Sequence, residues 1–208
     1  MAKNQKKKKP RHKNPGGVMG RSDIPYAQRL QLQQSHNINW SREESVRIVM
    51  YCWASALHKL KGIGYSRLVR FNNRFREVDA EFYGQEIELS LDRAKRRLGS
   101  MGIEISGELM MAPPEKGRTP REMEIMNNVV QAVQCATICG CMAANDVFGY
   151  AEKPLMQIRE EVERLTARYS KEGEKFLLED MEKIGFKIIS GHAVGFVDET
   201  GKAVRVKS

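Results

Sequence analysis

Residues 41–65 have the sequence SREESVRIVMYCWASALHKLKGIGY, and this stretch decides the fold class. Ser41 and Glu44 have capping-box spacing: the Ser41 side chain can accept a hydrogen bond from the Glu44 amide, and the Glu44 carboxylate can accept one from the Ser41 amide. We therefore predict a helix that begins at Ser41. Its apolar residues recur at helical spacing from Val46 to Leu60, and Gly62-Ile63-Gly64 predicts its end.

Further helices are predicted on both sides of this stretch. The signal Ser22-Asp23-Ile24-Pro25 predicts a short helix over residues 24–34. Apolar spacing predicts a second helix over about residues 66–82 and a third over about 90–101, which Gly102 ends. Residues 103–105, Ile-Glu-Ile, predict a short strand.

The same order of elements recurs after Thr119. Thr119 and Glu122 form a second capping box, and the apolar helix that follows, from Pro120 to about residue 145, breaks at Phe148-Gly149-Tyr150, as the first does at Ile63-Gly64-Tyr65. The apolar spacing of the next two helices repeats as well. We interpret this as an internal duplication with a period of about 84 residues. The alternative is chance, since any two three-helix segments share caps and spacing. The matched apolar positions are Leu68, Phe71, Phe75 and Val78 with Leu155, Ile158, Val162 and Leu165, and Ala94, Leu98 and Met101 with Leu177, Met181 and Ile184.

The predicted fold class is mainly α, with two tandem pseudo-repeated three-helix units and a minor C-terminal β-hairpin. The hairpin is expected because apolar and polar residues alternate on both sides of Asp198-Glu199-Thr200-Gly201. The predicted ranges are a disordered basic arm over 1–22, repeat 1 over 23–112, a linker over 113–118, repeat 2 over 119–191 and the hairpin tail over 192–208.

Composition excludes several classes of protein. Hydrophobic residues make up 41% of the 208 residues, which can supply a core. No stretch approaches the roughly 20 apolar residues of a membrane span. The start Met-Ala-Lys-Asn is not followed by the apolar segment of a secretory signal, so we expect a cytoplasmic protein with reduced cysteines and no membrane association.

The first 22 residues hold most of the positive charge. The formal net charge is +9, and this segment holds eight Lys or Arg and no acid, which leaves +1 for the rest. Such a segment cannot bury enough apolar surface to order itself. We expect a flexible arm that binds the phosphates of DNA or RNA without sequence preference and with strong salt dependence; a solubilising tail is the alternative. The residues predicted to bind are Lys6, Lys7, Lys8, Lys9, Arg11 and Lys13.

The two copies have opposite charge. Residues 41–101 contain twelve Lys or Arg and eight Asp or Glu, whereas residues 119–184 contain eight and twelve. In the first copy, cations and an asparagine that could contact phosphates or base edges are predicted to form a nucleic-acid-binding face; a solvated charged face is the alternative. In the second, three acids are predicted to bind a protein partner. The charges could also pair the copies, within one chain or in a homo-oligomer. The basic set is Arg67, Arg70, Asn73, Arg74, Arg93, Lys95, Arg96 and Arg97, and the acidic set is Glu160, Glu161 and Glu163.

No residue pattern predicts catalysis, a cofactor or a metal site. Cys135, Cys139 and Cys141 lack the spacing of metal ligands, so they are predicted to be buried and structural. The four histidines lie in unrelated contexts, and no phosphate-binding glycine motif occurs. Asp79 and the acids that follow it are predicted to lie on a solvated edge.

The stretch from Ser41 through Gly64-Tyr65 to Met101-Gly102-Ile103, with its echo at Phe148-Gly149-Tyr150, resembles small helical proteins encoded by phages and prophages of Gram-positive bacteria. The resemblance implies an accessory role in a bacterial host cell, such as replication, gene control or counter-defence, and it carries no site residue. The leading hypothesis is a non-enzymatic nucleic-acid-binding accessory protein. The rival is an adaptor or inhibitor that binds a host or phage protein through the acidic face.

Overall fold

The computed structural model describes residues 26–197 and 203–204, with side chains for residues 41–195 and 203–204. Two compact units divide the chain, Met1–Asn37 and Ile38–Ser208, and the hydrophobic core belongs to the second. The predicted arm residues from Lys6 to Lys13 lie outside the described residues, as does the expected turn at Asp198-Glu199-Thr200-Gly201.

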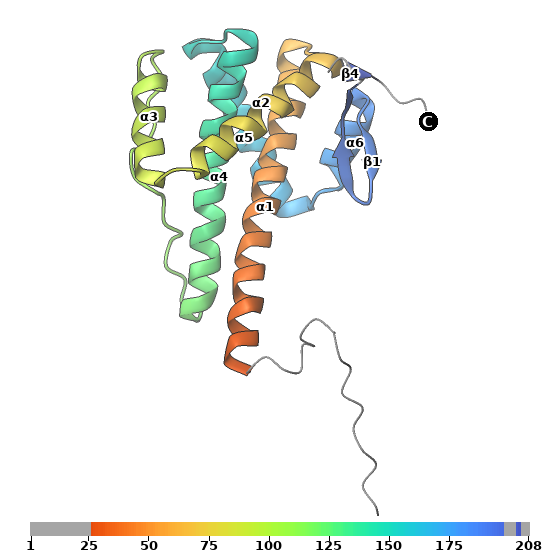
Figure 1. Ribbon diagram of the computed structural model, residues 1–208. Coiled ribbons are helices and arrows are strands. Elements are labelled where there is room, and N and C mark those ends of the chain that lie inside the picture. The colour runs from red at the N-terminus through yellow and green to blue at the C-terminus, as the bar shows by residue number, and fades with distance from the viewer. Residues whose placement is uncertain (1–25, 198–202, 205–208) are drawn as a thin grey trace, which may run out of the picture. The chain divides into compact units, whose positions relative to one another are not determined.

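The described part of the chain is mainly helical, as predicted. Figure 1 shows the helices together with short strands near the C-terminus. The helices are α1 (Tyr26–Lys61), α2 (Tyr65–Tyr83), α3 (Ile87–Gly99), α4 (Pro120–Phe148), α5 (Glu152–Glu172) and α6 (Lys175–Ile184). The strands are β1 (Lys187–Ile189), β2 (His192–Val194), β3 (Phe196–Val197) and β4 (Ala203–Val204).

The predicted start of the first helix is wrong. Ser41 lies inside α1, where its carbonyl accepts a hydrogen bond from the Ser45 hydroxyl at 2.7 Å. The Glu44 carboxylate accepts from Arg47 Nε at 3.1 Å. The expected short helix over 24–34 and the expected helix from Ser41 are one continuous helix, because residues 26–40 contain no proline or glycine that would interrupt it.

One stretch in the second half of α1 is buried on every side. All ten residues from Ile48 to Leu57 are buried, and a helix without a polar face must be surrounded by other elements. Trp53 packs against Phe71 of α2, with ring centroids 6.1 Å apart. Ser55 donates a hydrogen bond to Asp180 of α6 at 2.9 Å, and the amide of Ala193 in β2 donates to the Tyr51 hydroxyl at 2.7 Å.

Helix α4 meets α1 at a glycine. A Cβ atom placed on Gly140 would lie 2.1 Å from Nε1 of Trp53, a separation that no real contact permits. The Trp53 side chain is fully buried, so the surrounding side chains leave it no space to move away from an added methyl group. Gly140 therefore allows the indole to lie directly against the α4 backbone.

Replacing Gly140 with alanine should destabilise the protein by about 1–3 kcal/mol, because the added methyl group overpacks a filled core. Urea denaturation followed by circular dichroism measures the free energy of unfolding. Gly99→Ala is the matched control, since this glycine also lies in a helix and no atom stands within 4 Å of an added Cβ. A Gly140→Ala protein as stable as the control would contradict this account of the α1–α4 contact.

The helix-start prediction at Thr119 is confirmed. The Thr119 hydroxyl accepts from the Glu122 amide at 3.3 Å, and the Thr119 amide donates to the Glu122 carboxylate at 2.7 Å. The apolar stripes predicted for α2, α5 and α6 are buried. Helix α3 begins three residues before the predicted start and ends at Gly99.

Two antiparallel pairs of strands follow α6. Strand β1 pairs with β2, and β3 pairs with β4 with Phe196 opposite Val204. The second pair flanks the turn predicted at Asp198-Glu199-Thr200-Gly201. The predicted strand over 103–105 does not form: Gly102, at φ +82°, turns the chain so that the Ile103 amide donates to the Leu98 carbonyl at 2.9 Å and Ile103 is buried.

Candidate nucleic-acid interface and a polar pocket

Two of the predicted nucleic-acid-binding arginines converge on one carboxylate. Arg74 of α2 donates from Nε to Asp146 Oδ2 at 2.8 Å and also pairs with Glu77 at 3.0 Å. Arg97 of α3 donates to the other oxygen of Asp146 and to Asn145 Oδ1 at 3.3 Å. The hydrogen bond to Asp146 is the main reason that the pKa of Arg74 is raised. Asp146 thus ties α2 and α3 to the last turn of α4.

Sequence reasoning assigned no role to Asp146, although a signal existed. An acid in the last turn of a helix lies at the negative end of the helix dipole, an unfavourable position unless cations compensate for it. Arg74 and Arg97 provide that compensation. Arg67 adds a third positive charge nearby, since its guanidinium lies 5.1 Å from the ring centroid of Phe148.

The remaining members of the basic set face solvent. Asn73 is exposed on α2, and Arg93 of α3 is exposed and hydrogen-bonded to Gln85. The other cations of the set are also exposed, and within residues 41–195 none has a carboxylate within the 4.0 Å limit of an ion pair. These are Arg67, Arg70, Lys95 and Arg96.

Two of the three predicted partner-binding acids are already paired within the protein. Glu161 of α5 accepts from Lys59 of α1 at 3.0 Å and from Arg164 at 2.6 Å, and its side chain is 13% exposed. Glu163 accepts from Arg159 at 2.9 Å. Glu160 is exposed and forms no ion pair with any side chain the structure describes. The acidic set therefore does not form a uniform, unpaired surface.

The ion pairs of Glu161 should make stability depend on acid pH. The hydrogen bond from Arg164, followed by that from Lys59, lowers the pKa of Glu161 from 4.5 to about 2. A lowered pKa contributes stability above the unfolded value, and that contribution is lost as pH falls from about 4.5 toward 2. Glu161→Gln should flatten this part of the curve of unfolding free energy against pH. The control Glu160→Gln should follow the wild type, and equal curves for both variants would contradict the assignment.

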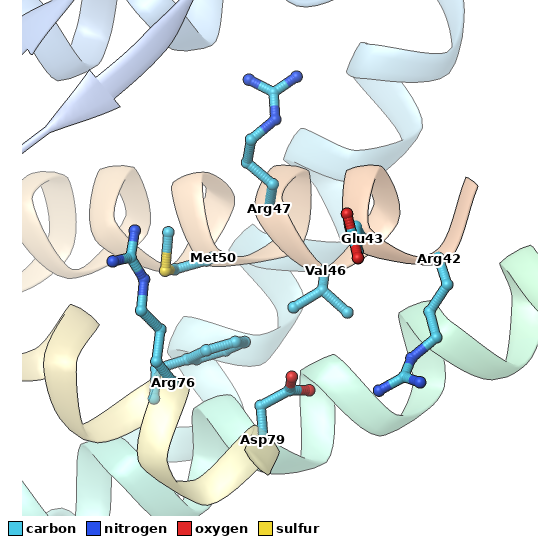
Figure 2. A pocket seen from close by; sticks show the side chains of 8 residues that line it. Arg42, Glu43, Val46, Arg47, Met50, Arg76 and Asp79 are labelled. Carbon is cyan, nitrogen blue, oxygen red and sulfur yellow. The ribbon is translucent and has the colours of Figure 1, made fainter. Parts of the chain in front are cut away.

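A pocket of about 260 Å³ lies between α1 and α2. Figure 2 shows the carboxylate of Asp79 pointing into the gap between the two helices, with Arg42 and Arg76 on either side of it. Figure 2 also shows that Arg47 points away from this gap. On that other side its guanidinium pairs with Glu44 and Glu174. The full lining is Arg42, Glu43, Val46, Arg47 and Met50 from α1, and Phe75, Arg76 and Asp79 from α2.

The charged groups of this pocket are incompletely paired. The Oδ1 atom of Asp79 is buried and has no hydrogen-bond partner among the described residues. Burial raises the pKa of Asp79, and the positive charge of Arg42 opposes the shift. The Arg42 guanidinium lies over the face of Tyr83, 3.3 Å from the ring centroid. The sequence-based expectation that Asp79 lies on a solvated edge is wrong for this oxygen, because it is buried.

The cysteines are buried and free, as their apolar context predicted. Burial raises the pKa of Cys52 and of Cys141 to about 12, so neither is a thiolate at neutral pH. Burial also raises the pKa of Cys135, and its interaction with Tyr83 opposes the shift. Among the residues with described positions, no three His, Cys, Asp or Glu side chains gather as metal ligands would.

No protein family, curated protein or solved structure matches this chain. Within the described residues, no helix combines the length and the apolar character needed to cross a membrane. The described residues offer two candidate sites for phosphate-bearing ligands: the exposed cations of α2 and α3, and the pocket between α1 and α2.

Proposed function

We propose that this chain is a non-enzymatic nucleic-acid-binding accessory protein. The observation that carries the proposal is the distribution of charge along α2. The first half of this helix contains arginines and no acid, whereas the second half contains one arginine and three acids; there is no acid in its first turn and no base in its last. In chain order these residues are Arg67, Arg70, Arg74, Arg76, Glu77, Asp79 and Glu81. This order is the reverse of the one that stabilises a helix dipole.

This reversed order argues against a face that serves only solubility or helix stability. The cations instead add to the partial positive charge at the start of α2, and together they favour a bound anion. Asn73, Arg70 and Arg67 are exposed along this half of the helix. In the other half the acids outnumber Arg76, the one cation there, so contact with an extended phosphate backbone is expected at the N-terminal half of α2. The arm over residues 1–22 would add further salt-dependent contacts.

The experiment is a binding titration with mixed-sequence duplex DNA, single-stranded DNA and RNA at two salt concentrations. The double variant Arg67→Gln, Arg70→Gln should bind roughly tenfold more weakly at low salt. Its affinity should also depend less steeply on salt: the negative slope of log affinity against log salt should shrink in magnitude by about 2, one for each lost phosphate contact. The control Arg121→Gln removes an exposed arginine at the start of α4 and should leave both quantities unchanged. No binding by the wild type at low salt, or equal affinities of the double variant and the control, would overturn the proposal.

The proposal also includes an internal duplication, with copies that diverged in surface charge, and a phage accessory role in the cytoplasm of a bacterial host. The duplication is supported by helix order and by matched positions such as Leu68 and Leu155, which are both buried. The sequence-based alignment matched Gly64 with Gly149, but these two glycines differ in backbone conformation. The end of α1 has its positive φ at Gly62, whereas the end of α4 has it at Gly149.

A further inference from the structure

The pocket between α1 and α2 contains hydrogen-bonding capacity that the described part of the chain does not use. Arg42 stacks on the ring of Tyr83 through the flat face of its guanidinium, and this stacking leaves the N–H groups at the edge available. Among the described side chains no acceptor pairs with Arg42 or with Arg76, which is exposed at the other side of the pocket. The Asp79 carboxylate lies between them (Figure 2), and its Oδ1 atom has no donor among the described residues.

Such an arrangement is unusual for groups with a purely structural role. Buried polar atoms are nearly always hydrogen-bonded, and each exception calls for an explanation. Arg47, on the same helix as Arg42, shows the structural alternative: its guanidinium is paired with both Glu44 and Glu174 and points away from the gap. Arg42, Arg76 and Asp79 lack such pairing and surround one cavity.

The chemistry of the three groups defines a ligand. Two guanidiniums from different helices favour an anion with several acceptor oxygens, for which phosphate is the best match. The Asp79 carboxylate would repel that anion, so a ligand must also place a donor beside it (Figure 2). Val46, Met50 and Phe75 line the same space and provide an apolar wall. The volume of about 260 Å³ is small for a ligand site and suits one compact molecule.

We propose that this pocket binds a single nucleotide with a terminal phosphate. The phosphate accepts hydrogen bonds from Arg42 and Arg76, and an amino or hydroxyl group of the same nucleotide donates to Asp79. The nucleotide is either free or the end of a nucleic-acid strand, and the second source rests on the proposed function. The exposed Glu43 also lines the pocket and disfavours additional phosphates, which is consistent with a monophosphate.

The test is calorimetric titration of the full chain with adenosine 5′- and 3′-monophosphate, adenosine and inorganic phosphate. A monophosphate should bind more tightly than adenosine or phosphate alone. Arg76→Gln and Arg42→Gln should each weaken it by about tenfold or more, as expected for a lost charge-assisted hydrogen bond, and Asp79→Ala should remove the preference for the nucleotide over phosphate. Arg121→Gln is the matched control and should bind as the wild type does. Circular dichroism shows whether a change at Arg42 or Asp79 disturbs folding. Arg76 is exposed, so Arg76→Gln is expected to fold normally and tests the pocket even if the other variants do not.

A second arm separates the two sources of the phosphate. Short single strands phosphorylated at the 5′ end, at the 3′ end or at neither end are compared with the free nucleotides. Preference for a phosphorylated strand that Arg76→Gln removes supports a strand end, and binding of the free nucleotide without such a preference supports a mononucleotide. The inference is overturned if no monophosphate binds better than adenosine and the strands bind equally. The proposed function would survive that result if strand binding still required Arg67 and Arg70.

Discussion

The contact between the Trp53 indole and the α4 backbone at Gly140 is the constraint on which the described fold depends. It fixes how closely α1 approaches α4, and no side chain larger than hydrogen fits there. Because residues 48–57 of α1 are buried on all sides, other elements must pack around them, and these include α2, α6 and β2. The contacts of Phe71, Asp180 and Ala193 with α1 show that they do.

Helix α2 connects this core with both candidate sites. Its apolar stripe packs into the core, while its exposed first half presents Arg67 and Arg70. Its second half contributes Arg76 and Asp79 to the pocket beside α1. The ion pair between Arg74 and Asp146 holds the helix between these two regions, so its position relative to α4 affects both. A nucleic-acid strand and a nucleotide would therefore bind to different parts of the same helix.

Two carboxylates of the fold differ in how they are paired. Where a charged group is structural, its partners surround it: Glu161 has both Lys59 and Arg164. The Oδ1 atom of Asp79, in contrast, has no partner among the described residues, and Asp79 lines the pocket between α1 and α2. This contrast distinguishes structural charge from charge that is available for a ligand, and the sequence does not show it because both kinds of residue occur on amphipathic helices.

The sequence by itself determined the elements whose causes are local. The capping box at Thr119 and the buried stripe of α2 depend on residues within a few positions of one another, so spacing was sufficient to predict them. The same motif failed at Ser41, because a capping box starts a helix only where the preceding residues leave the helical conformation. Tertiary structure alone decided that Arg47 of α1 pairs with Glu174 just before α6, that Arg74 of α2 meets Asp146 of α4, and that Asp79 of α2 lines a pocket beside α1. Those contacts join residues from different helices, and only packing of the helices around Trp53 brings them within reach.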